Sequence, residues 1–260
     1  MEYTLDFIQT VNDWQAYGMR ERKNEIAQKL RSFSIDDHLK KCDKPCYRIT
    51  DFRNHVKERS IFDAFLNQRI LFGVTSWTTD YKVAQNFYKE GIPLYPYEGI
   101  NYIIKITNCS NIILNIESLY SDAAFIKACE KHKKNIKEYS KGIGRFWNTQ
   151  KEVVLDIESV SVDNIYAFWG TSSTKEDFYK KYINDFVKII NLSNGKITYK
   201  FIDDFLNQNI GPHWDDDEQN VKCIISTLKK EVDFYNKLKQ CGLLSFDNCF
   251  LTLDLDKTYA

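Results

Sequence analysis

The sequence predicts an α+β fold in which a strand-rich core lies between helical segments. The hydrophobic period is three to four residues over the first forty positions, and it returns to that value after about residue 174. Between these regions, short runs rich in Ile, Val, Tyr and Phe are typical of strands. A chain of 260 residues is long enough for one large domain or for a compact core with an appendage.

The first segment, residues 1–41, is expected to be a packed helical element. Phe7, Val11 and Trp14 recur at intervals of three and four with polar residues between them, as on one face of a helix. The same spacing returns at Ile26, Leu30 and Phe33.

The second segment, residues 42–172, is expected to be the α+β core. Its six predicted strands lie near 46–50, 70–75, 101–107, 111–116, 151–157 and 162–168. Helical patterns at 52–68, 79–89 and 117–139 alternate with them. The third segment, 173–260, is expected to be a mainly helical extension, with a terminal strand where leucines alternate with polar residues at 251–255.

Composition limits the function classes. The chain is 43% hydrophobic and 15% aromatic, which excludes global disorder, and 36 basic residues balance 36 acidic ones, so no net field attracts nucleic acid or membranes. No apolar run is long enough to span a membrane, and the first residues do not have the pattern of a secretory signal. Seven scattered cysteines without a CxxC pair suit a reducing compartment, so we expect a cytoplasmic protein.

One spacing suggests a metal site. His38, Cys42 and Cys46 recur every four residues and would share one face of a helix. Pro45 would break that helix, and no fourth ligand is evident nearby, so we expect no metal.

Three segments of the core hold polar residues that strand propensity does not explain. Arg48 lies within the apolar strand CYRIT, where the simplest interpretation is an edge-strand arginine with its head in water. Ser76 and Thr78 follow a strand and precede a helical pattern, where hydroxyls commonly act as caps. Gln150 and Glu152, two residues apart, would share one face of an extended strand.

The order of these segments is more specific than any one of them. Tyr-Arg on a strand, then Ser-x-Thr before a helix with V-A-x-x-F, then Gln-x-Glu opening a later strand, resembles the mono-ADP-ribosyltransferases. The likeness covers about residues 46–156. It implies a split mixed or antiparallel β-sandwich that grips NAD⁺ and cleaves its nicotinamide–ribose bond, with no metal.

The resemblance assigns roles to the site residues, and their chemistry suits the task. Arg48 would hold the pyrophosphate by charge-assisted hydrogen bonds. Ser76 and Thr78 would orient Glu152 and Arg48 and touch the ribose. Glu152 would stabilise the positive charge that develops on the ribose carbon. Many members have glycine after the arginine, where this chain has Ile49, whose backbone can still approach the nicotinamide.

Residues before the glutamate are expected to recognise the acceptor. In the family, glutamine at the position of Gln150 accompanies asparagine or guanine targets, and an amide can read another amide or a base edge but does not neutralise a guanidinium. Arg145, Phe146 and Trp147 precede it in the expected acceptor loop, where either aromatic ring would stack on a target or belong to the core.

Two neighbouring segments complete the expected site. Tyr95 and Tyr97, between a helix and a strand, occupy the position of the family's phosphate–nicotinamide loop and would cover the nicotinamide ring. A basic run from Lys131 to Lys141 would hold nucleic-acid phosphates or form a solvated helix face.

Three functions therefore remain open. The first is transfer of one ADP-ribose from NAD⁺ to a macromolecule other than an arginine side chain, with a nucleobase of RNA or DNA slightly favoured over protein. Without a secretion signal, such an enzyme resembles toxins of bacterial toxin–antitoxin or anti-phage systems, which would bring an antitoxin or chaperone as partner. The second is an NAD⁺ glycohydrolase that depletes NAD⁺, and the third is a catalytically inactive partner-binding module.

Overall fold

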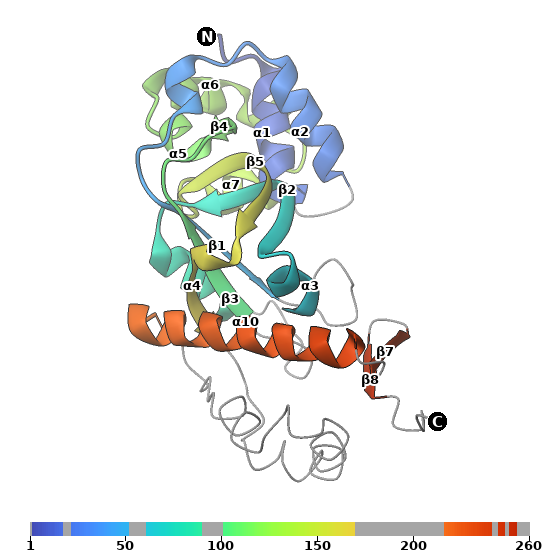
Figure 1. Ribbon diagram of the computed structural model, residues 1–260. Coiled ribbons are helices and arrows are strands. Elements are labelled where there is room, and N and C mark those ends of the chain that lie inside the picture. Colours follow the sequence, from blue (N-terminus) through green and yellow to red (C-terminus); the bar gives the residue numbers. More distant parts are fainter. Residues whose placement is uncertain are drawn as a thin grey trace, which may run out of the picture. The chain divides into compact units, whose positions relative to one another are not determined.

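The fold is described from a computed structural model (Figure 1), which defines seven stretches of the chain, residues 2–17, 22–51, 61–89, 101–169, 216–240, 244–247 and 250–253. Helices and an antiparallel sheet are both present, which confirms the α+β class. Residues 173–215 of the expected helical extension lie outside the described residues, as do residues 52–60 of the helix expected at 52–68.

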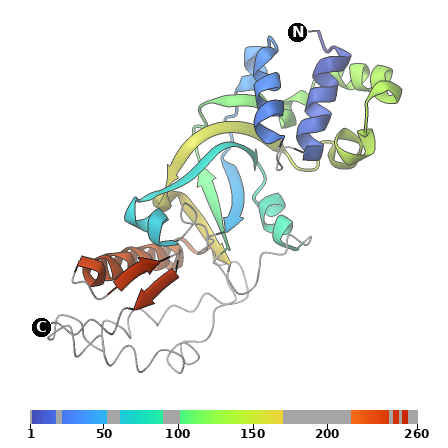
Figure 2. The same ribbon diagram turned by 90° about the vertical axis from the view of Figure 1, so that its right-hand side faces the viewer.

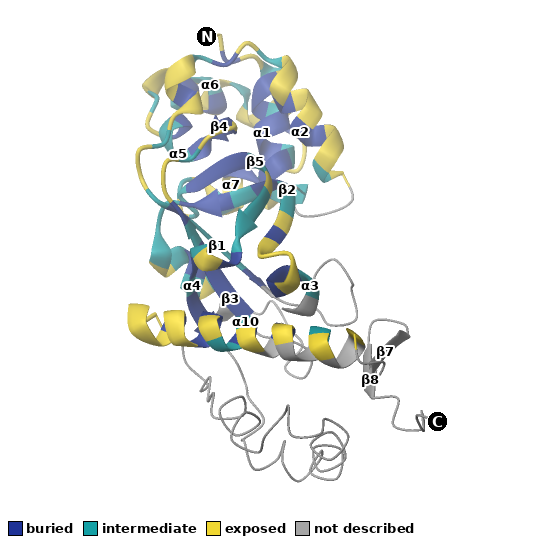
Figure 3. Cartoon of the chain, in the orientation of Figure 1, coloured by how far each residue is buried: buried dark blue, intermediate teal, exposed yellow. Residues whose placement is uncertain are grey.

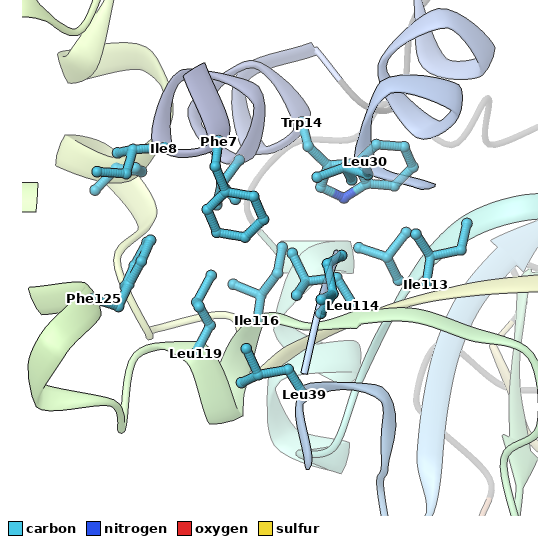
Figure 4. Close-up of a cluster of buried hydrophobic side chains, with 14 of the residues drawn as sticks. Phe7, Ile8, Trp14, Leu30, Leu39, Ile113, Leu114, Ile116, Leu119 and Phe125 are labelled. Atoms are coloured by element: carbon cyan, nitrogen blue, oxygen red, sulfur yellow. The ribbon is translucent and has the colours of Figure 1, made fainter. Parts of the chain in front are cut away.

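The N-terminal segment is helical, as predicted. It contains α1 (Leu5–Tyr17), α2 (Lys23–Ser32) and a short 3-10 turn, η1 (Asp37–Lys40). The apolar stripe of α1 is buried and packs with α2 and β4 into one hydrophobic cluster, shown in close-up in Figure 4. Fully burying side chains such as Phe7 and Leu30 stabilises the fold by about 1.5–3 kcal/mol each relative to solvent exposure.

Six strands form one sheet in the order β4-β5-β2-β1-β3-β6. The pairs β1–β2 and β4–β5 are antiparallel, and a bulge interrupts the second pair between Ile112 and Leu114. The described strands of the core all belong to this single sheet. The finer prediction of a split sandwich therefore stays a prediction. The strands are β1 (Cys46–Asp51), β2 (Arg69–Thr78), β3 (Asn101–Ile106), β4 (Ile112–Asn115), β5 (Glu152–Ser161) and β6 (Ile165–Trp169).

The helix expected over 117–139 is interrupted. Asn115 caps α5 (Ile116–Leu119) by accepting the Ser118 N–H, and Asp122 caps α6 (Ala123–His132) by accepting the Ala124 N–H at 2.8 Å. Each cap begins a new helix, which divides the expected one. The other helices here are α3 (Ile61–Leu66), α4 (Tyr81–Lys89) and α7 (Ile143–Phe146), with 3-10 turns at Lys133–Asn135 (η3), Tyr139–Lys141 (η4) and Val162–Asn164 (η5).

Near the end of the chain, α10 (Glu218–Gln240) confirms the predicted helix. It packs on α3, η5 and β6 with Val221, Ile225 and Leu228 buried, while its outer face is exposed (Figure 3). The expected terminal strand is half of a hairpin, in which β7 (Leu244–Asp247) pairs antiparallel with β8 (Phe250–Leu253) beside α10 (Figure 2).

The chain divides into two compact units. Unit 1 comprises Met1–Ile49, Leu71–Ile92 and Ile104–Val160, and unit 2 comprises the rest. The division expected at 41/42 and 172/173 stays a prediction. Over the described ranges, no helix combines the length and apolar character that a membrane crossing requires.

Candidate functional site

Three of the predicted residues lie on three neighbouring strands of unit 1. Glu152 begins β5, Ser76 lies in β2, and Arg48 lies in β1, and β2 is the middle strand of the three. Outer strands of such a triplet lie about 10 Å apart. β1 has neighbours on both sides, so Arg48 does not lie on an edge strand.

Ser76 connects the other two residues. Its hydroxyl donates a hydrogen bond to Glu152 Oε1 at 2.5 Å, and its backbone carbonyl accepts one from Arg48 Nη1. Arg48 is half-buried, with its guanidinium carbon 6.0 Å from the centre of the Phe72 ring. The arginine, the serine and the glutamate, 104 residues apart at their extremes, therefore form one hydrogen-bonded group.

Glu152 is covered by the N-terminal helix. Trp14 Nε1 donates to Glu152 Oε1 at 2.8 Å, and Glu152 is only 4% exposed. The neighbouring Gln15 is fixed on both sides, because it accepts from the Tyr120 hydroxyl at 2.7 Å and donates to the Trp147 carbonyl at 3.3 Å. The second carboxylate oxygen of Glu152, Oε2, is buried and accepts no hydrogen bond from the described residues.

Burial raises the pKa of the Glu152 carboxyl above its ordinary value. The hydrogen bonds from Ser76 and Trp14, the nearby amide of Gln15 and the positive charge of Arg48 act in the opposite direction, because each stabilises the ionised form. Burial is the largest of these effects, so the site holds a carboxyl group that gives up its proton less readily than an exposed glutamate.

This shift predicts a pH-dependent stability. Between the ordinary and the raised pKa, the folded protein binds more protons at Glu152 than the unfolded chain, so this contribution is complete at low pH and is lost as pH rises through the raised pKa. We expect Glu152→Gln to remove that component. Urea unfolding of both proteins from pH 4 to pH 8 measures it, and parallel pH profiles for the two would contradict the assignment.

The other residues of the hydroxyl motif have structural contacts. Thr78 accepts a hydrogen bond from the Asp80 N–H at 3.1 Å and so caps the turn before α4, as the simpler interpretation predicted. Trp77, between Ser76 and Thr78, is buried in the core. Ile49 follows Arg48 in β1 and is half-buried.

The predicted pairing of Gln150 with Glu152 is not found in the form expected. The expectation required extended backbone between them, but Lys151 has a φ of +46°, in the left-handed region, and β5 begins only at Glu152. Side-chain alternation therefore does not connect the two residues. Gln150 is half-buried in the turn that leads into the strand.

The expected acceptor loop is partly exposed. Trp147 is 36% exposed and its ring centroid lies 4.6 Å from that of Tyr120, while Arg145 lies over the ring of Phe146 at 5.0 Å. Trp147 has a φ of +41°, which is rare for a bulky residue and is associated with functional turns. The Lys131–Lys141 run is largely exposed, and Tyr95 and Tyr97 lie outside the described residues.

Sequence reasoning missed two members of this group. Trp14 was expected only as an apolar helix position, and Gln15 was not singled out. Trp14 is separated from Glu152 by 138 residues in the sequence, and Gln15 is its neighbour on the helix. Helical periodicity shows that a side chain is buried but not which distant residue it contacts. No signal in the sequence marked either residue as a partner of Glu152, because the burial of Gln15 is known only from the structure.

Comparisons with known proteins do not identify a family for this chain. No family model, no curated protein and no solved structure matches the chain.

Proposed function

We propose that the chain is a mono-ADP-ribosyltransferase that transfers ADP-ribose from NAD⁺ to a macromolecular acceptor other than arginine. The observation that supports this most is the group Arg48–Ser76–Glu152, which lies on three adjacent strands and is joined by hydrogen bonds. The resemblance to the mono-ADP-ribosyltransferases implies that these three residues lie in one site. For the same reason we propose an ADP-ribosyltransferase-like core.

Each residue has a task in this proposal. The guanidinium of Arg48 pairs with the pyrophosphate of NAD⁺, and Ser76 fixes the carboxylate of Glu152 by its hydroxyl. Since Oε1 already accepts two hydrogen bonds, Oε2 is the oxygen assigned to the ribose. There the negative charge stabilises the oxocarbenium-like transition state more than the bound ground state.

Access to Glu152 needs a displacement in this scheme. The carboxyl group is 4% exposed beneath α1, so a substrate reaches it only after the side chains of Trp14 or Gln15, or the turn that carries Gln150, have moved. A buried carboxyl is then also protected from water until the substrate displaces that cover.

The acceptor is assigned to the side of Gln150 and the half-exposed aromatic turn before β5. An amide three residues after Trp147 suits a nucleobase, which offers an edge for hydrogen bonds and a face for stacking, and the exposed Lys131, Lys134 and Lys137 of the basic run can pair with phosphates. RNA or DNA is therefore preferred over a protein side chain as the acceptor.

Labelled NAD⁺ tests the proposal. We expect label from the adenylate phosphate to enter RNA, DNA or protein of a cell extract, and Gln150→Glu to reduce this transfer while NAD⁺ hydrolysis persists, because the substitution alters acceptor recognition alone. Mass spectrometry of nucleosides and peptides identifies the acceptor. Label confined to free ADP-ribose would indicate a glycohydrolase, and equal loss of both activities would place Gln150 on NAD⁺.

The covering of Glu152 favours a second candidate, an inactive partner-binding module. In that case the carboxylate serves to fasten α1 to the sheet through Trp14 and Ser76, and the exposed face of α10 is one surface for an antitoxin or chaperone. Absence of NAD⁺ cleavage by the folded protein under all acceptor conditions would support this function over the first.

A further inference from the structure

Three cysteines that are dispersed in the sequence meet at the start of β1. Cys42 Sγ lies 3.7 Å from Cys46 Sγ, and Cys109 is the neighbour with the largest effect on the pKa of Cys46. Cys46 is fully buried between two half-buried thiols. None of the three has a part in the proposed transfer of ADP-ribose.

The segment that carries the first two thiols is held at several points. The Lys41 carbonyl accepts from Asn115 Nδ2 at 2.7 Å, and the Lys44 ammonium pairs with Glu117 at 2.7 Å. The Cys42 thiol also donates to the Lys44 carbonyl at 3.5 Å. These contacts keep the two sulfur atoms facing each other in the reduced protein.

The three thiols differ in their readiness to ionise. The side-chain contact with Cys46 lowers the pKa of Cys42 to about 7, and Cys46 also lowers the pKa of Cys109. The pKa of Cys46 itself is raised, because of its side-chain contacts with Cys109 and Cys42 and because it is buried. A thiolate is the nucleophilic form, so the half-buried Cys42 has the properties of an attacking thiol and Cys46 those of its resolving partner.

We propose that Cys42, Cys46 and Cys109 form a redox modification site, in which a peroxide oxidises Cys42 and Cys46 to a disulfide that Cys109 can exchange. The Cys42 thiolate attacks one peroxide oxygen, the O–O bond breaks, and hydroxide leaves to give a sulfenic acid. Cys46 then attacks the Cys42 sulfur, the S–O bond breaks, and the Cys46 proton leaves with the oxygen as water. In total, two thiols and one hydrogen peroxide give one disulfide and two waters.

The geometry requires little movement for this reaction. The sulfur–sulfur distance between Cys42 and Cys46 must shorten from 3.7 Å to the length of a disulfide bond, about 2.05 Å. Transfer of the bond to Cys109 proceeds by thiolate attack on Cys46 and releases Cys42 as the leaving thiolate. This proposal does not depend on the proposed transferase activity, because the disulfide is detected in the protein itself without an activity assay.

Peptide mapping tests the site on the full-length protein. Trypsin spares the Lys44–Pro45 bond, so Cys42 and Cys46 remain in one peptide that ends at Arg48. After treatment of the folded protein with hydrogen peroxide, we expect this peptide to be two hydrogens lighter and resistant to alkylation. Iodoacetamide should modify Cys42 of the reduced protein about 10-fold faster than Cys129, which is buried and whose pKa is raised to about 12.

Variants separate the roles. In Cys46→Ser, the resolving thiol is absent, so we expect Cys42 to accumulate as a sulfenic acid that a dimedone reagent captures. In Cys42→Ser, the expected product is a Cys46–Cys109 disulfide. Exposed Cys223 provides the matched control, and Cys223→Ser should leave the pattern unchanged.

Two results would overturn the proposal. In the first, peroxide leaves Cys42 and Cys46 as open to alkylation as Cys223, or modifies them no faster in the folded protein than in urea. In the second, one equivalent of zinc binds tightly and protects all three thiols until a chelator removes it, which would identify a metal site in place of a redox site.

Discussion

Glu152→Gln is expected to lower the rate of NAD⁺ cleavage about 100-fold or more while the protein stays folded. The amide keeps an oxygen that accepts from Ser76 and Trp14, but it has no negative charge to stabilise the ribose cation. The rate of nicotinamide release at saturating NAD⁺ measures the effect. We expect the free energy of unfolding at pH 7 to remain within about 1 kcal/mol of the wild type.

A control on the same strand is available. Glu158 lies in β5 and is exposed, so Glu158→Gln should leave cleavage unchanged. If Glu152→Gln kept full activity, Glu152 would have a structural role and the transferase proposal would fail. If both variants lost activity equally, the charge of the surface, rather than the buried carboxylate, would be responsible.

Trp14→Ala is expected to cause the largest loss of stability, about 3–5 kcal/mol in the free energy of unfolding. Trp14 is 1% exposed and belongs to the hydrophobic cluster of α1, α2 and β4, so its removal leaves a cavity that the surrounding helices fill only in part. The substitution also removes the donor to Glu152 Oε1. Urea unfolding followed by far-UV circular dichroism measures the loss.

Trp14→Phe separates packing from hydrogen bonding. It retains most of the buried area but removes the indole N–H, so we expect a smaller loss of about 1–3 kcal/mol and a further rise in the pKa of Glu152. The rise would appear as a shift of the pH dependence of stability to higher pH. A Trp14→Phe protein with wild-type stability and pH profile would show that the hydrogen bond to Glu152 contributes nothing measurable.

Local patterns in the sequence predicted most of the elements and part of the site. The apolar stripe of α1 and the β-branched runs of the strands are short-range signals, so the helical first segment and the six strands were found within a few residues. The convergence of Arg48 and Glu152 is a long-range property, and it was predicted through the order of three motifs rather than through periodicity.

Features that depend on distant contacts or on unusual backbone were not predicted. Lysine rarely adopts a positive φ, so no residue type indicated that Lys151 would separate Gln150 from Glu152. Likewise, Cys109 is too far along the chain from Cys42 for any spacing rule to associate the two thiols. The hydrogen bond from Trp14 to Glu152 is the third example, because an amphipathic pattern shows which side chains are buried but not which residues they contact.

The hydrogen bond between Trp14 and Glu152 has a consequence for biosynthesis. During translation the first helix leaves the ribosome long before its partner exists, since 138 residues separate donor and acceptor. Until the strand that begins at Glu152 has emerged, Trp14 lacks its hydrogen-bond acceptor and the cluster beneath α1 lacks Val154, so the apolar face of this helix is incompletely covered. Folding of this region therefore finishes late, and a chain truncated before residue 152 should be a substrate for chaperones or proteases.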